Sequence, residues 1–115
     1  MNSITLNGKD YPLNFGMAAK AEIYSAAGLR FTGDDFGKSL EITFETMLNI
    51  AHIALKHGAR VAGQQYNNDY YETCDLFDTE PDKLGEIVEM FNESMLDQGN
   101  AKQPGKQKAK PAAKK

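Results

Sequence analysis

The sequence has no tryptophan, one cysteine and four prolines among its 115 residues. The lone Cys74 excludes an intramolecular disulfide and suits a reducing cytosol. No apolar run approaches the roughly 20 residues that a membrane-spanning helix needs, and the N-terminus lacks the basic and then apolar segments of a secretory signal. We therefore expect a cytosolic chain that has no contact with a membrane.

Strongly apolar residues are also scarce. Leu, Ile, Val and Phe account for 23 of the 115 residues, which is close to the level at which disorder becomes plausible. The last of the 23 is Leu96, and no aromatic residue follows Phe91. The sequence therefore predicts a single globular domain over residues 1–99, followed by a disordered tail over residues 100–115.

The two signs of charge are unevenly placed along the chain. Residues 1–100 hold all 16 acids and seven bases, a net charge of −9, whereas residues 101–115 hold six lysines and no acid. An acidic domain does not attract a polyanion, so any nucleic-acid contact must come from the tail. The tail has no aromatic residues to stack on bases, so we expect it to solubilise the chain or steer a partner, and a nucleic-acid partner is not expected. Its lysines are Lys102, Lys106, Lys108, Lys110, Lys114 and Lys115.

Residues 4–13, ITLNGKDYPL, predict a β-hairpin. Asn7 and Gly8 suit a two-residue type I′ turn, because both central positions of that turn need a positive φ. Two strands alone do not fold stably, so the hairpin must pack on something else. The turn places five residues on one face of the hairpin: Ile4, Leu6, Lys9, Tyr11 and Leu13.

After the hairpin the apolar period changes from two to about 3.6, which is typical of helices. Asn14 can cap a first helix, and Gly28 stands where its C-terminus needs left-handed backbone. A second, longer helix is predicted from Asp34 or Asp35 to Gly58. Its apolar stripe consists of Phe36, Leu40, Phe44, Met47, Ala51 and Leu55.

Residues 58–68 carry glycines and a polar run, which favour an exposed loop. Asp69 and Glu72 fit a capping pair for a short third helix. Thr79 can cap a last helix that Gly99 ends, with an inward stripe of Leu84, Ile87, Val88, Phe91 and Met95. The sequence thus predicts an α+β, mostly helical fold, in which the N-terminal β-hairpin packs on a bundle of about four helices.

Two segments partly resemble ligand-binding motifs. Residues 33–39, GDDFGKS, are one residue short of a phosphate-binding loop, and their aspartates would repel phosphate. The acids between Asp78 and Glu89 follow the spacing of a calcium loop, but Lys83 stands where that loop needs glycine. The two histidines fall on different faces of a helix. We therefore expect no cofactor, no metal and no catalytic residue, and no enzymatic activity.

The predicted central helix has more apolar residues than one stripe can hold. A helix that is apolar on more than one side is either central to the fold or in contact with a partner, and methionines adapt well to both roles. Both interpretations stay open for its isoleucines, which the hairpin and the last helix would cover in the first case. Tyrosines often line interfaces too, and equally often cover the edge of a core. The candidate protein-binding residues are Ile42, Met47, Ile50, Ile53, Tyr66, Tyr70 and Met90.

Residues 3–31, SITLNGKDYPLNFGMAAKAEIYSAAGLRF, resemble the start of tail assembly chaperones of bacteriophages with long, non-contractile tails. Proteins of that family begin with a hairpin that reads roughly I-x-L/I-N-G-K-x-Y-x-L-x-F, followed by a helix that ends in an aliphatic residue after glycine. Residues 40–58 look like the long central helix of the family. The segments DYYETCDLFD and PDKLGEIVEMF look like its last two helices.

The resemblance implies a small helical chaperone that acts in the cytoplasm of the bacterial host and is absent from the mature virion. Members of the family bind the tape measure protein, keep it soluble and help to recruit tail tube protein around it, and many are also made in a longer version by ribosomal frameshifting. We count self-association among the expected contacts. An alternative that rests on the lysines of the tail is a small nucleic-acid-associated regulatory protein.

Overall fold

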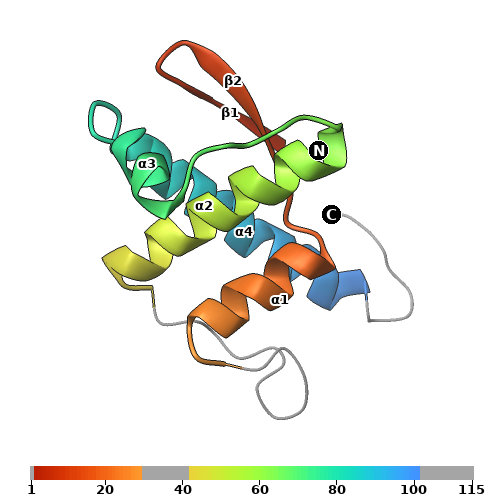
Figure 1. The fold of residues 1–115 in the computed structure, drawn as a ribbon. Coiled ribbons are helices and arrows are strands. Elements are labelled where there is room, and N and C mark those ends of the chain that lie inside the picture. Colours follow the sequence, from red (N-terminus) through yellow and green to blue (C-terminus); the bar gives the residue numbers. More distant parts are fainter. Residues whose placement is uncertain (1, 30–41, 102–115) are drawn as a thin grey trace.

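The computed structural model describes residues 2–29 and 42–101, without the side chains of residues 97–101. Two antiparallel strands are followed by four helices, which confirms the α+β, mostly helical fold that the sequence predicts (Figure 1). The basic tail beyond residue 101 lies outside the described residues. The elements are β1 (Asn2–Leu6), β2 (Lys9–Leu13), α1 (Met17–Ala26), α2 (Phe44–Ala62), α3 (Tyr70–Asp75) and α4 (Asp82–Ala101).

The hairpin has the predicted turn and register. Asn7 and Gly8 have φ values of 52° and 81°, as a type I′ turn requires. The turn pairs Leu6 with Lys9 and Ile4 with Tyr11. The apolar residues of the hairpin face the helices, where three of them are buried: Ile4, Leu6 and Leu13.

Helix α2 is the centre of the fold, because it packs against β2, α1, α3 and α4 (Figure 1). Strand β1 packs instead on α4. The backbone of β2 comes close to α2 at Gly58, where an added Cβ would lie 2.0 Å from the carbonyl oxygen of Pro12. The backbone N–H of Asn14 donates a hydrogen bond to the carbonyl oxygen of Ala54 at 3.2 Å. The hairpin therefore lies directly on the central helix.

The predicted bounds of the second helix are wrong at both ends. Thr43 is extended, and its side chain caps α2 by accepting a hydrogen bond from the N–H of Thr46. The helix runs through Gly58 and ends at Gly63, whose φ of 74° is left-handed. Gly58 thus allows close packing against β2 and does not end the helix. The loop that was expected from residue 58 begins at residue 63. The predicted helix positions at residues 34–41 lie outside the described residues.

Helix α1 follows the prediction at its C-terminus better than at its N-terminus. Gly16 is the N-cap residue, and Asn14 accepts a hydrogen bond from the N–H of Gly16 at 2.8 Å without capping the helix. Gly28 has the predicted left-handed backbone, with a φ of 81°. Ala26, in the last turn of α1, is exposed. Three apolar residues at helical spacing before it are buried: Phe15, Ala19 and Ile23.

The last two helices carry the predicted capping box and the predicted stripe. Asp69 and Glu72 cap α3 reciprocally, which gives the backbone N–H groups of Asp69 and Glu72 each a carboxylate acceptor. Thr79 does not cap α4, which begins at Asp82, and Gly99 does not end it, because the helix continues to Ala101. The inward residues of α4 are Leu84, Ile87, Val88 and Phe91, which are buried, and Met95, which is partly buried.

The hairpin turn is tied to the connection between α3 and α4. The backbone N–H of Asn7 donates to Oε1 of Glu80 at 2.7 Å. The side-chain amide of Asn7 donates to the carbonyl oxygen of Leu76 at 3.3 Å and accepts from the hydroxyl of Thr79 at 2.8 Å. We call this set of hydrogen bonds the Asn7 clamp. It fixes the connection against the hairpin, although about 70 residues separate the two in sequence.

Candidate protein-binding site

The three candidate isoleucines do not form a common surface. Ile50 and Ile53 are 0% and 4% exposed and belong to the core. Of the two interpretations open for these residues, the structure has the one in which the elements around α2 cover them. Ile42, which precedes α2, is 42% exposed and stays available.

The other candidate residues lie at the edge of the core and in different places. Met47 is on α2 and Met90 is on α4, and both pack partly buried against the core. Tyr66 follows α2, whereas Tyr70 starts α3 and packs edge-on against the ring of Tyr71 at 5.4 Å. The rings of Tyr66 and Tyr70 both pack against the ring of His52, at 6.0 and 6.1 Å, but the structure does not bring all the predicted residues together into one site.

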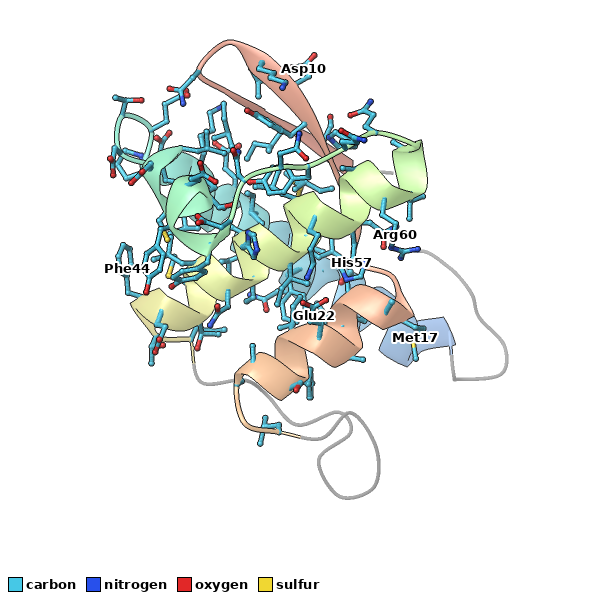
Figure 2. All side chains as sticks on the ribbon, in the orientation of Figure 1. Asp10, Met17, Glu22, Phe44, His57 and Arg60 are labelled. Carbon is cyan, nitrogen blue, oxygen red and sulfur yellow. The ribbon has the colours of Figure 1, made fainter. Side chains whose placement is uncertain are left out.

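An apolar hollow of about 140 Å³ lies between the first turns of α2 and the connection from α3 to α4. We call it the apolar groove. Phe77 and Leu84 are buried and form its floor. Phe44 is 70% exposed and stands at the outer end of α2, open to a partner (Figure 2). The groove is lined by Phe44, Leu48, Cys74, Phe77, Asp78, Pro81 and Leu84.

Acidic side chains surround the apolar groove. Burial raises the pKa of the Cys74 thiol, and the carboxylates of Asp75 and Asp78 raise it further. Burial also raises the pKa of Tyr70, with smaller contributions from Cys74 and from the carboxylate of Glu45. Burial is the main cause of both shifts, and the smaller contributions show that the carboxylates of Asp75, Asp78 and Glu45 lie close enough to disfavour a negative charge on the thiol or the phenol. Cys74 therefore remains a thiol at neutral pH and packs as a small apolar residue.

Sequence reasoning missed most of the residues that line the groove. It placed Phe44 on a buried stripe because it began the second helix too early. Thr43 followed by Thr46 was the signal for the true start, since a threonine can cap a helix with its side chain. With the start at Thr43, Phe44 occupies the first helical turn, where side chains extend beyond the rest of the fold. The other lining residues come together only through tertiary packing.

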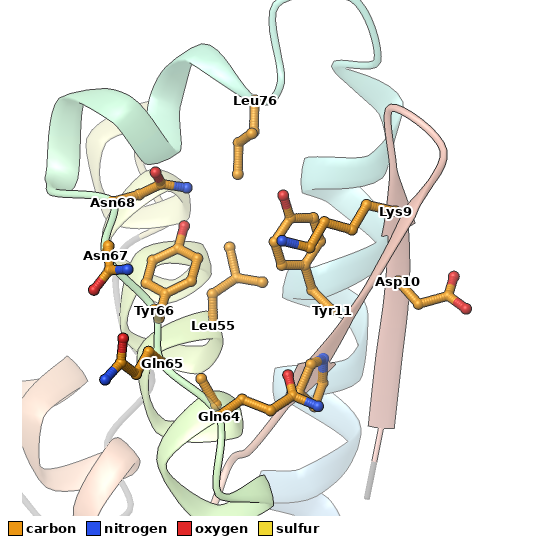
Figure 3. Close-up of a pocket in the computed structure, with 12 residues that line it drawn as sticks. Lys9, Asp10, Tyr11, Leu55, Gln64, Gln65, Tyr66, Asn67, Asn68 and Leu76 are labelled. Carbon is orange, nitrogen blue, oxygen red and sulfur yellow. The ribbon is translucent and has the colours of Figure 1, made fainter.

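A larger, polar hollow of about 350 Å³ lies between β2 and residues 64–68. We call it the polar pocket (Figure 3). Leu55 lies at its base, and Tyr11 and Tyr66 face one another from opposite walls with ring centroids 6.3 Å apart. The ammonium group of Lys9 lies 5.1 Å from the centre of the Tyr11 ring. Four carboxamides along residues 64–68 can each donate and accept hydrogen bonds there.

A buried hydrogen-bond network holds Tyr66 in place. Its hydroxyl lies 2.6 Å from Oγ1 of Thr73, and Nδ1 of His52 lies 2.8 Å from the same oxygen. Burial raises the pKa of Tyr66 and lowers that of His52, so both groups are neutral at pH 7. Thr73 is completely buried and satisfied by these partners. The network therefore positions the wall of the polar pocket.

A small ion cluster joins α1 to α2 (Figure 2). The two carboxylate oxygens of Glu22 lie 2.5 Å from Nζ of Lys56 and 2.8 Å from Nε2 of His57. Arg60 donates a hydrogen bond to Nδ1 of His57 at 3.1 Å. Lys56 and His57 lie before the C-terminal turn of α2, which continues to Ala62, and both contact α1.

Other kinds of site were sought in residues 2–29 and 42–101. In these ranges, no three histidine, cysteine, aspartate or glutamate side chains gather as a metal site would require. None of the helices described here combines the length and apolarity needed to cross a bilayer. Glu80, one of the acids with calcium-loop spacing, accepts a backbone hydrogen bond in the Asn7 clamp.

Comparison with known proteins gives no relative. No protein-family model matches the sequence, and neither the curated proteins nor the solved structures include a significant match.

Proposed function

We propose that this protein is a tail assembly chaperone of a bacteriophage with a long, non-contractile tail. It binds the tape measure protein, keeps that protein soluble and promotes assembly of the tail tube around it. The observation that carries the proposal is the pattern of residues 3–31, in which an N-G-K hairpin is followed directly by an alanine-rich helix. The proposed partners are the tape measure protein and the tail tube protein. The proposed place of action is the host cytoplasm, and the protein is absent from the mature virion.

The exposed apolar side chains support this proposal. A chaperone for an amphipathic helical client needs an accessible apolar surface, because burial of that surface stabilises the complex by about 25 cal/mol per Å². Phe44 lines the apolar groove, Ile42 precedes it by two residues, and Tyr71 belongs to the helix that provides Cys74. The exposed large apolar residues in the described part of the chain are Met17, Ile42, Phe44, Val61, Tyr71 and Leu96.

Coexpression with the client tests the proposal. The full chain is produced in bacteria together with the tape measure protein encoded near it in the same genome. We expect the tape measure protein to move from the insoluble to the soluble fraction and to copurify with this chain. If the tape measure protein is equally insoluble with and without the chain, the proposal is wrong.

A second candidate function rests on the basic tail. The six lysines in residues 101–115, without any acid among them, would allow a small regulatory protein to contact nucleic acid through phosphate groups. Such contact depends strongly on salt. A salt-sensitive complex with DNA or RNA that disappears when residues 101–115 are deleted would favour this function over the first.

A further inference from the structure

We propose that the apolar groove binds an amphipathic helix whose apolar stripe is flanked by lysine and arginine side chains. The inference deepens the proposed function and rests on it, since this helix would be the part of the client that the chaperone holds. Three features of the groove favour such a partner: its apolar lining, its fixed walls and the negative charge around it.

The apolar lining fits the anchor residues of a helix. An amphipathic helix enters a groove with side chains at positions i, i+3 or i+4, and i+7, which form one apolar row. The groove presents a floor of Phe77 and Leu84 and an exposed rim residue, Phe44. Aromatic side chains are enriched at protein interfaces, so we expect a bound helix to cover Phe44 and to bury the part of its ring that solvent now reaches.

The walls of the groove are held in place before any partner arrives. The Asn7 clamp fixes the connection that contains Phe77, Asp78 and Pro81. The opposite wall belongs to α2, whose first turn is capped by Thr43. Because little ordering of the protein is then needed on binding, more of the contact energy contributes to affinity.

The charge around the groove selects a basic partner. Residues 69–86 include seven acids and one base, Lys83. Asp78 lines the groove, and Asp75 and Glu45 act on its thiol and on the adjacent Tyr70. The ion pairs found among the described residues lie between α1 and α2, away from these acids. A partner with lysine or arginine beside its apolar stripe would complement the acids, whereas an acidic partner would be repelled.

Two other occupants fit the groove less well. The tail of this chain has the right charge, but its residues 102–115 contain no large apolar side chain to fill the hollow. A second copy of the chain would bring the same acidic surface close to the first, and like charges oppose that contact.

Two synthetic helical peptides with the same leucine stripe test the inference. One is flanked by lysines and the other by glutamates, and their binding to the full chain is measured by fluorescence anisotropy. We expect the lysine peptide to bind at least tenfold more tightly than the glutamate peptide, and this preference to shrink as salt is added. Equal binding of the two peptides at low salt would overturn the inference.

Substitutions at the rim locate the site. Phe44→Ser removes a side chain that is 70% exposed, so it leaves the fold intact, and we expect it to weaken binding of the lysine peptide about tenfold. Asp78→Asn should weaken binding of the lysine peptide severalfold and leave that of the glutamate peptide unchanged or improved. The matched control is Val61→Ser at the opposite end of α2, where Val61 is 49% exposed. If the control weakens binding as much as Phe44→Ser, the groove is not the site.

Cys74 offers an independent readout because it is the single cysteine of the chain and lines the groove. Bound lysine peptide should slow the reaction of Cys74 with a thiol reagent at least severalfold. Failure of the peptide to protect Cys74 would contradict the inference, even if the tape measure protein copurifies. Protection of Cys74 by the peptide, with no rescue of the tape measure protein, would support the groove and reject the proposed function. Sedimentation gives the oligomeric state of the chain without peptide. If the chain is a dimer and Cys74 in that dimer already reacts slowly with the thiol reagent, the groove is covered by a second copy and the inference is overturned.

Discussion

The absence of a side chain at Gly58 allows the backbone of β2 to pack directly on α2. A Cβ at Gly58 would lie 2.0 Å from the carbonyl oxygen of Pro12 and 2.7 Å from the nitrogen of Leu13. These are backbone atoms of the hairpin, so they cannot turn away as a flexible side chain would. Relief of the clash would require β2 to move off α2.

We therefore expect Gly58→Ala to destabilise the protein by about 3 kcal/mol, because overpacked cores usually lose 1 to 3 kcal/mol. Urea denaturation followed by circular dichroism measures the loss. Gly85→Ala is the matched control, since Gly85 lies in α4 with no atom within 4 Å of an added Cβ. It should stabilise the protein by about 0.5 to 1 kcal/mol through helix propensity. Equal effects of the two substitutions would contradict the close approach at Gly58.

At the scale of elements, Asn7 both forms the hairpin turn and joins the hairpin to the connection between α3 and α4. Asn7 adopts a φ of 52°, which most side chains avoid, and it also forms the Asn7 clamp. The turn itself is a local matter that Asn7-Gly8 predicts well. The Asn7 clamp depends on the position of the connection from α3 to α4 relative to the hairpin, and no pattern close to Asn7 in the sequence predicts that position.

Two substitutions at Asn7 separate these contributions. Asn7→Gly keeps the turn and removes the side-chain hydrogen bonds to Leu76 and Thr79, so we expect a loss of about 1 to 2 kcal/mol. Asn7→Ala removes the same bonds and also strains the turn, which should add about 1 kcal/mol. Thermal and urea unfolding measure both. If the two variants are equally stable, the left-handed backbone at Asn7 is not maintained in solution.

At the scale of the whole molecule, the cluster around Glu22 links α1 to the rest of the fold. Burial alone would raise the pKa of Glu22, but hydrogen bonds from Lys56 and His57 outweigh it and hold the pKa below its usual 4.5. A carboxylate with a lowered pKa stabilises the folded state above the pKa that it has when unfolded. That stabilisation disappears as the pH falls through the folded-state pKa.

We expect Glu22→Gln to destabilise the protein at pH 7 by less than about 1 kcal/mol, because the side chain of Glu22 is 41% exposed and solvent screens its ion pairs. The difference from the unsubstituted chain should vanish as the pH falls from about 4.5 to below the lowered pKa. Urea midpoints at several pH values measure it. Glu86→Gln, at an exposed site on α4, is measured at the same pH values as a control for the removal of one carboxylate. A difference that grows toward low pH would refute the assigned role of Glu22.

Local patterns predicted much of the architecture and little of the candidate site. The turn at Asn7-Gly8, the capping box at Asp69 and the inward stripe of α4 depend on residues close in sequence, so they could be recognised. The start of α2 also had a local signal, the capping Thr43. The C-terminal end of α2 did not, because the backbone of β2, which requires glycine at residue 58, is brought there by tertiary packing. The apolar spacing of α2 did not decide whether Ile50 and Ile53 are buried, because the elements that cover them are also brought there by tertiary packing. The apolar groove combines side chains from two helices and a connection, so no single stretch of sequence reveals it.

The position of β1 on α4 has a consequence for synthesis of the protein in the cell. Strand β1 packs on α4, which follows it by more than 70 residues in the sequence, so the part of the hairpin face that β1 contributes stays uncovered until translation has passed α4. A pause or truncation upstream of residue 82 would release a nascent polypeptide with an open core. Such a product would itself be a substrate for the host's proteases and folding factors.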